Sequence, residues 1–180
     1  MSVNLSERAL RQLAPSIVGA PEQVAERLRA AGLEVEEIVP LRDLLEPIVV
    51  ARVEEVTPHP NADRLRVCVV NDGGEAPLQI VTGAPNVRAG ACYPLVRSGV
   101  RLPSGRKIKK GKLRGEVSEG MLGSADEMEL GSDHDGLMEL AGSPAPGTPL
   151  VEVLEVEGVV YVLGGNPSEE EVGEALRAEG

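Results

Sequence analysis

Short β-branched runs separated by Gly- and Pro-rich turns constrain the fold of residues 48–140 more than any other feature of the chain. The strand-like runs are 48–56, 64–70, 78–82, 91–97, 107–114, 118–122 and 137–140. Asn71-Asp72-Gly73-Gly74 is typical of a hairpin turn. Short strands at this regular spacing indicate a small closed barrel rather than a βαβ sheet. Ser124 also predicts a brief helix over 125–130, which Gly131 ends.

The two ends of the chain have a different pattern from the middle. Apolar residues at helical spacing predict helices over 4–14 and 21–31, and 33–39 alternates as a strand. After a Gly- and Pro-rich linker at 142–147, the sequence predicts a strand over 159–163 and a helix over 169–178, opened by a capping box of Ser168 and Glu171. We therefore expect a mostly β chain. Its barrel, about 45–142 within a domain at 45–145, is inserted into a small split α/β domain made of 1–44 and 146–180.

The charges are strongly segregated along the sequence. Residues 76–115 hold nine of the 18 basic residues and none of the 29 acidic ones, in a chain of net charge −11. This pattern favours a basic face for a polyanion, presented by an acidic frame. The alternative is a lysine-rich edge strand that discourages aggregation. On charge alone the two interpretations stay open.

The near absence of aromatic residues limits how such a face can bind. The chain has no Phe and no Trp, and its two aromatic residues are Tyr93 and Tyr161. Single-stranded nucleic acid is usually held by stacking its bases on aromatic rings. If the partner is RNA, phosphate contacts, arginine stacking and shape must therefore carry most of the binding.

No arrangement typical of a catalytic or metal site is visible. Cys68 and Cys92 form no CxxC pair, which favours free thiols in a reducing compartment. His59 and His134 are far apart, and no nucleophile is paired with a base. No apolar run is long enough for a membrane span, and no signal-peptide pattern is present. We expect a cytoplasmic, non-catalytic protein without a metal, a cofactor or a membrane partner.

Three ordered motifs resemble the EMAP-type tRNA-binding domain. They are His59-Pro60-Asn61-Ala62-Asp63-Arg64-Leu65, the segment 79–87 (QIVTGAPNV) and the segment 109–122 (KKGKLRGEVSEGML). The flanking 31–36 (AGLEVE) and Asn166-Pro167 are similar to the N-terminal region of the bacterial phenylalanyl-tRNA synthetase β subunit. The resemblance runs from about Pro21 to about Asn166, and it implies an OB-fold inserted into a small α/β domain.

The resemblance also implies where RNA would bind. In a regular strand Lys107 and Lys109 would share one face and Lys110, Lys112 and Arg114 the other, unless a bulge at Lys110-Gly111 rejoins them. We expect these basic residues at the centre of the site, and Met121 in the core. The full set of predicted RNA-binding residues is Lys107, Lys109, Lys110, Lys112, Arg114, Arg88, Arg97, Arg101, Asn86 and Ser118.

The expected function is a non-catalytic tRNA-binding module that holds the tRNA backbone and would assist aminoacylation performed elsewhere in a synthetase. The alternative is an assembly domain that docks on a partner subunit, because OB-folds host many ligands. The expected partners are tRNA and, besides it, a synthetase subunit or a second copy of the chain. Salt separates the two functions, because phosphate binding weakens steeply with added salt and an apolar protein interface does not.

Overall fold

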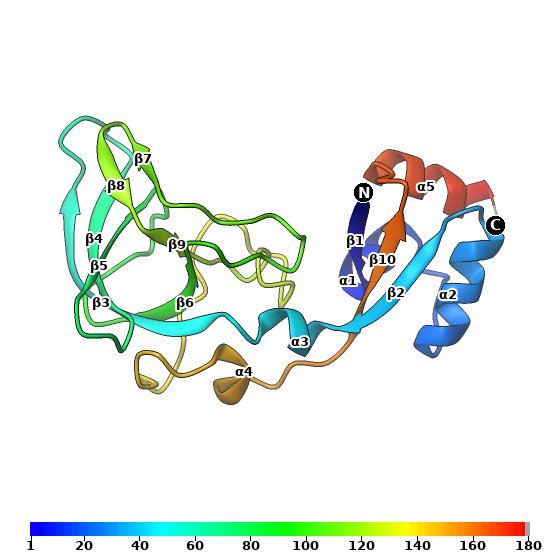
Figure 1. Ribbon diagram of the computed structural model, residues 1–180, viewed down its shortest axis with the longest axis horizontal. Coiled ribbons are helices and arrows are strands. Elements are labelled where there is room, and N and C mark those ends of the chain that lie inside the picture. Colours follow the sequence, from blue (N-terminus) through cyan, green and yellow to red (C-terminus); the bar gives the residue numbers. More distant parts are fainter. Residues whose placement is uncertain (179–180) are drawn as a thin grey trace. The chain divides into compact units, whose positions relative to one another are not determined.

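The computed structural model describes residues 1–178 and divides the chain into two units. The terminal unit consists of Met1–Leu44 and the segment from Glu157 onward, and the barrel unit is the continuous stretch Leu45–Val156 (Figure 1). The predicted insertion of a β barrel into a small α/β domain is therefore confirmed.

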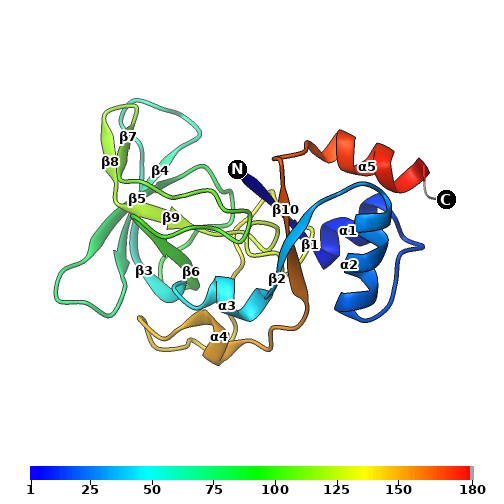
Figure 2. The same ribbon diagram turned by 45° about the vertical axis from the view of Figure 1, so that its right-hand side comes forward.

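The terminal unit is a three-stranded antiparallel sheet with helices packed against it. Its strands are β1 (Ser2–Ser6), β10 (Val159–Gly164) and β2 (Val35–Pro40), in the order β1-β10-β2. The helices α1 (Glu7–Leu13), α2 (Pro21–Ala30) and α5 (Glu169–Ala178) lie on the same side of this sheet (Figure 2). Leu10, Leu28, Tyr161 and Leu176 belong to one buried cluster, so both ends of the chain share a core. No helix within residues 1–178 is long and apolar enough to cross a membrane.

The predicted helix over 4–14 is wrong in its first half. Residues Ser2–Ser6 form β1 and pair with β10, where Leu5 is opposite Tyr161. The helix starts only at Glu7, because the Ser6 side chain accepts a hydrogen bond from the Ala9 amide (3.0 Å) and caps it. Val3 and Leu5 fit a strand as well as a helix, and pairing with β10 decides for the strand.

The barrel unit is built on five antiparallel strands in the order β5-β4-β3-β6-β9. These are β3 (Val49–Pro58), β4 (Arg66–Asn71), β5 (Leu78–Thr82), β6 (Cys92–Arg97) and β9 (Gly120–Leu122). The two ends of the sheet meet at β5, where the Glu119 amide donates to the carbonyl oxygen of Gln79 (2.8 Å). A separate hairpin of β7 (Gly111–Leu113) and β8 (Glu116–Ser118) rises beside this closure. The predicted OB-fold is confirmed.

Aliphatic side chains and one buried tyrosine fill the barrel. Val53, Cys68, Ile80, Tyr93 and Leu95 are fully buried in one cluster. Cys68 and Cys92 are both free and buried, as predicted. Burial raises the pKa of the Cys68 thiol to about 11, which keeps it protonated and unreactive at neutral pH.

Residues 146–156 belong to the barrel unit, whereas the sequence assigned them to the split domain. They follow the start of β3: the Gly147 amide donates to Val50 O (2.7 Å) and the Leu150 amide to Ile48 O (2.9 Å). The short helices α3 (Leu41–Leu45) and α4 (Leu150–Val153) lie close to the unit boundaries in the sequence, and neither was predicted.

Three other predicted elements are shorter in the structure. Residues 125–130 form a turn rather than a helix: the Met128 amide bonds Ser124 O (3.1 Å), but Glu129 then takes a left-handed φ of 60°. The predicted cap itself exists, since the Ser124 hydroxyl and the Glu127 carboxylate bond each other's amides. Of the predicted strand 137–140, only an isolated bridge between Leu140 and Cys92 forms. The predicted strand 107–114 is broken before Gly111.

Gly120 should tolerate no side chain, because β9 approaches β6 closely there. A Cβ at Gly120 would lie 2.7 Å from the carbonyl oxygen of Val96. We expect Gly120→Ala to lower the free energy of unfolding by about 2 kcal/mol or more, measured by urea unfolding of the purified chain. Gly111→Ala is the matched control, since a Cβ at Gly111 meets no atom within 4 Å. Equal effects of both changes would contradict the close approach.

The hydroxyl of Tyr161 is buried and has no hydrogen-bond partner among the described residues. Burial, with smaller contributions from Glu7 and Glu22, raises the pKa of Tyr161 to about 12. We expect Tyr161→Phe to stabilise the chain by about 1 kcal/mol at pH 7, since it removes an unpaired buried polar group. The parent should also lose stability between pH ~10 and ~12, where only the unfolded tyrosine releases its proton, and the variant should lose less there. Urea unfolding of the parent and the variant at pH 7 and at pH ~12 measures both effects. A variant less stable than the parent at pH 7 would disprove the prediction.

Candidate nucleic-acid interface

An open hollow of about 310 Å³ lies between the segment 106–113 and strands β5, β8 and β9. We call it the basic hollow. Four cationic side chains line it: Arg106, Lys107, Lys109 and Lys112. The rest of its lining is apolar or small: Val81, Ile108, Gly111, Leu113, Ser118, Gly120 and Met121. A concave surface of this kind combines positive charge with an apolar floor.

Ile108 fixes the segment that carries the first lysines. Its side chain is buried, its amide donates to Val100 O (2.9 Å) and its carbonyl accepts from the Gly99 amide (2.7 Å). Lys107 and Lys109 on either side of it are exposed. The break before Gly111 then brings Lys112 to the same hollow, although a regular strand would turn it to the opposite face. The basic face is thus assembled by irregular backbone.

His59 ties the β7–β8 hairpin to the loop between β3 and β4. The ring is buried, and its Nδ1 accepts a hydrogen bond from the Asn61 amide (2.9 Å). Nδ1 is therefore unprotonated, so the ring proton is on Nε2, which donates to the carbonyl oxygen of Leu113 (2.8 Å). His59 is a structural residue that holds the hairpin carrying Lys112.

Ser118, one of the predicted RNA-binding residues, lies in the barrel closure. It is buried, and its hydroxyl accepts from the Val81 amide (3.0 Å) and donates to Gly120 O (2.9 Å). The neighbouring Gln79 side chain donates to Val117 O (2.9 Å). Ser118 lines the hollow, but its hydrogen bonds hold β8 against β5.

The basic residues that were predicted to bind RNA differ in whether their side chains already have partners within the protein. Within residues 1–178, the side chains of Lys107, Lys109, Lys112 and Arg114 are exposed and have neither an ion pair nor a hydrogen bond. Arg114 lies at the tip of the β7–β8 hairpin, with a left-handed φ of 53°, and is outside the lining of the hollow. The Lys110 ammonium is 4.0 Å from a carboxylate oxygen of Glu119, which partly offsets its charge.

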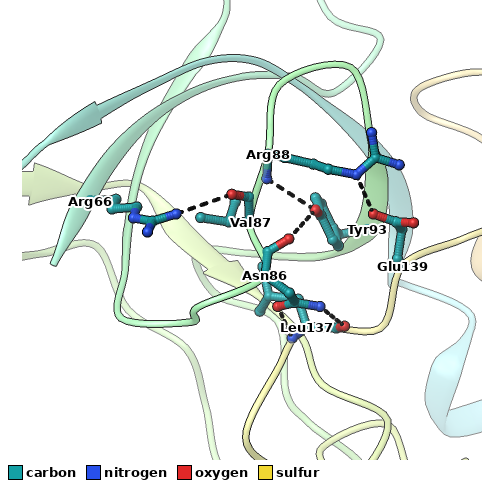
Figure 3. Close-up of polar contacts among 7 residues, drawn as sticks. All are labelled: Arg66, Asn86, Val87, Arg88, Tyr93, Leu137 and Glu139. Atoms are coloured by element: carbon teal, nitrogen blue, oxygen red, sulfur yellow. Dashed lines mark hydrogen bonds and ion pairs between the residues drawn. The ribbon is translucent and has the colours of Figure 1, made fainter. Parts of the chain in front are cut away.

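The other predicted residues bond to the scaffold (Figure 3). The Asn86 side-chain amide donates to Leu137 O and accepts from the Leu137 amide, both at 2.8 Å. Arg88 pairs with Glu139 (2.9 Å), which raises the pKa of the guanidinium and lowers that of the carboxyl. The Tyr93 hydroxyl donates to Asn86 O (2.9 Å) and accepts from the Arg88 amide (3.1 Å), which fixes this loop.

Two further arginines are also held. Arg97 bonds the Asp72 carboxylate and the Asp72 carbonyl, both at 3.1 Å. Arg101 donates to Gly105 O (2.8 Å). The structure therefore brings Lys107, Lys109 and Lys112 together in the hollow and leaves Arg88, Arg97, Arg101 and Asn86 in structural contacts.

Seven of the eleven residues that line the hollow were not among the predicted site residues, and two of these, Arg106 and Met121, bear on what the hollow can bind. Arg106 lines it, with Nη2 3.5 Å from the sulfur of Met121. The sequence signal for Arg106 was its position in the acid-free segment 76–115. A residue in an irregular loop cannot be assigned to one face of a strand, so the pattern did not show that it joins the site. Met121, expected in the core, is only partly buried and forms part of the wall. In the part of the chain that the structure describes, no three His, Cys, Asp or Glu side chains are grouped to hold a metal ion.

The His59 link predicts a local effect of its removal. We expect His59→Ala to speed amide hydrogen exchange in β7 and β8 by about tenfold, since the lost hydrogen bonds are worth about 1–2 kcal/mol. Exchange in β3 and β4 should change less. His134→Ala is the control, because within residues 1–178 that exposed ring has polar contacts only with its sequence neighbours Ser132 and Asp135. Unchanged exchange in the hairpin would show that His59 does not hold it.

Comparisons with known proteins show which proteins the chain resembles. The sequence profile of the family described as "Putative tRNA binding domain" matches residues 48–149, which is more than half of the chain. The phenylalanine–tRNA ligase beta subunit of Bordetella parapertussis is 47% identical over 162 residues, which are 90% of this chain and 20% of that protein. The corresponding subunit of Oleidesulfovibrio alaskensis is 44% identical over 164 residues, 91% of this chain and 20% of that protein.

Among solved structures, the C-terminal domain of Plasmodium vivax p43 is 26% identical, with 56% of each chain covered and a TM-score of 0.40. The chain spans about a fifth of the length of the curated relatives described above. The profile covers the barrel, and the identity to the ligase subunits extends over both units. The chain therefore belongs to the tRNA-binding domain family, in the form found in the N-terminal region of phenylalanine–tRNA ligase beta subunits.

Proposed function

We propose that this chain is a non-catalytic module that holds the phosphate backbone of tRNA through the basic hollow. The observation that carries this proposal is that Lys107, Lys109 and Lys112 line one hollow without a protein partner among the described residues. Ammonium groups without a bound carboxylate are available to phosphate, and each contact releases condensed counterions from the RNA. Arg114, exposed at the hairpin tip, extends the same basic surface.

The distribution of charge supports an oriented complex. The chain as a whole has a net charge of −11, so its acidic parts repel a polyanion. Binding is then confined to the acid-free segment, and the RNA approaches from that side. Glu116 in β8 and Glu119 just after it accept hydrogen bonds from Gln79, and Glu119 is also near Lys110. These carboxylates limit the surface and favour partners that fit it.

The relatives suggest the biological setting. They are beta subunits of phenylalanine–tRNA ligases, and this chain matches a fifth of their length. We propose that the module serves a cytoplasmic phenylalanine–tRNA ligase by holding tRNA and that aminoacylation takes place elsewhere in that assembly. Phosphate contacts position an RNA but do not read its sequence, so the choice of phenylalanine tRNA would rest with other parts.

Substitution of single lysines tests the site. We expect Lys109→Ala to lower the slope of log affinity against log salt by about one, since one phosphate contact is lost. Fluorescence anisotropy with labelled tRNA over a series of salt concentrations measures the slope. Arg88→Ala is the matched control: it removes one positive charge from the same unit, but this arginine is paired with Glu139. Its slope should stay close to that of the parent.

Equal slopes for Lys109→Ala and Arg88→Ala would mean that only net charge matters and that the hollow is not the site. If the folded parent binds no tRNA at low salt, the proposal fails. The chain would then be better explained as an assembly domain, and a complex with a ligase subunit or with a second copy, insensitive to salt, would support that function.

A further inference from the structure

We infer, on the basis of the proposed function, that the basic hollow takes one unpaired nucleobase, with the Arg106 guanidinium stacked on the base and the surrounding lysines on its phosphates. The bound RNA would then be a structured RNA with an extrahelical base. This assigns a separate role to Arg106: recognition of a base face rather than of phosphate.

The lining of the hollow favours a base over a phosphate. A site for phosphate alone needs donors at its centre, whereas the floor here is aliphatic. Val81 and Ile108 are 6% and 7% exposed, and Leu113 at the edge is 46% exposed. An exposed leucine between Lys112 and Arg114 on a short hairpin leaves apolar surface in water, and a flat apolar base would cover it. The exposed lysines of the lining would then contact the charged backbone beside such a base.

Arg106 supplies the flat surface that the rest of the hollow's lining lacks. Tyr93 and Tyr161 are both fully buried, so neither ring is available to a base. Unstacked bases pack on guanidinium planes as well as on aromatic rings. The Arg106 Nη2 lies 3.5 Å from the Met121 sulfur, so the guanidinium contacts the apolar wall. A polarisable thioether beside it adds favourable contact with a base.

The size of the hollow fits a single small group. Its volume of about 310 Å³ is at the low end of small-molecule sites, which occupy about 300–1,000 Å³. A base inside a helix is covered on both faces by its neighbours and cannot enter. A base that is bulged or splayed out of the helix can enter the hollow. Such a base is already unstacked, so binding does not have to supply the free energy of unstacking.

The experiment compares two RNAs: a short blunt-ended duplex, and the same duplex with one extra unpaired adenosine. We expect the full chain to bind the bulged duplex about tenfold more tightly, since one stacked base contributes that much. Arg106→Lys keeps the charge and removes the plane. It should abolish most of this preference and leave the affinity for the blunt duplex and the salt slope near those of the parent.

Arg114→Lys is the matched control, because it makes the same chemical change at an exposed arginine on the tip of the β7–β8 hairpin, outside the hollow. It should keep the preference for the bulge. Leu113→Ser, at an exposed position, should reduce the preference without affecting folding, which circular dichroism checks.

The outcomes separate this inference from the proposed function. Equal affinity of the parent for both duplexes, with tRNA binding that still depends on salt, overturns the base slot and leaves phosphate binding standing. A preference that Arg106→Lys retains overturns the role of Arg106. Absence of binding to tRNA and to both duplexes overturns the proposed function, and the inference falls with it.

Discussion

The closure of the barrel depends on Ser118, whose hydroxyl accepts from the Val81 amide and donates to Gly120 O. Gln79 and Glu119 add a backbone hydrogen bond and a side-chain hydrogen bond at the same seam. These contacts keep β5 against β8 and β9, so the sheet does not end in two open edges there. They also determine where the β7–β8 hairpin rises. Without these hydrogen bonds, strands β5 and β9 and the β7–β8 hairpin, which line the basic hollow, would not be held in fixed positions relative to one another.

The basic side chains themselves contribute little to the fold. Backbone groups and buried neighbours position them: Ile108 fixes Lys107 and Lys109, and His59 fixes the hairpin that carries Lys112. The cations are therefore held close to one another by contacts that do not use their charge. Like charges at short range repel, so the scaffold carries this cost and the charges stay available for a ligand. Preorganisation of this kind lowers the entropic cost of ordering the site when a ligand binds.

The sequence predicted the barrel well because alternation and turn chemistry are local signals. The five barrel strands and the α2 helix lie close to their predicted ranges. The errors arose where tertiary contacts decide. Val3 and Leu5 are in a strand only because β10 arrives from the far end of the chain. Residues 125–130 carry a correct cap, but the backbone turns at Glu129 after one turn.

The candidate site was harder to predict because charge in a sequence does not show which cations are already paired. Arg88 and Glu139 are 51 positions apart, and only folding brings them together. Arg97 meets Asp72 in the same way. Arg106 shows the opposite error, because it lines the hollow but was not predicted. It lies in an irregular loop, where no periodic pattern indicates which way a side chain faces.

The order of strands in the terminal unit has a consequence for biosynthesis. The central strand β10 lies between β1 and β2, yet it follows both in the chain, after the whole barrel unit. When β1 and β2 leave the ribosome they lack their shared neighbour, because β1 and β2 do not pair with each other in the sheet. Folded early, the barrel brings the ends of a long insertion together and lowers the entropic cost of closing that loop. The two ends of the barrel unit pair at Val49 and Pro149, so a folded barrel favours the addition of β10 between β1 and β2.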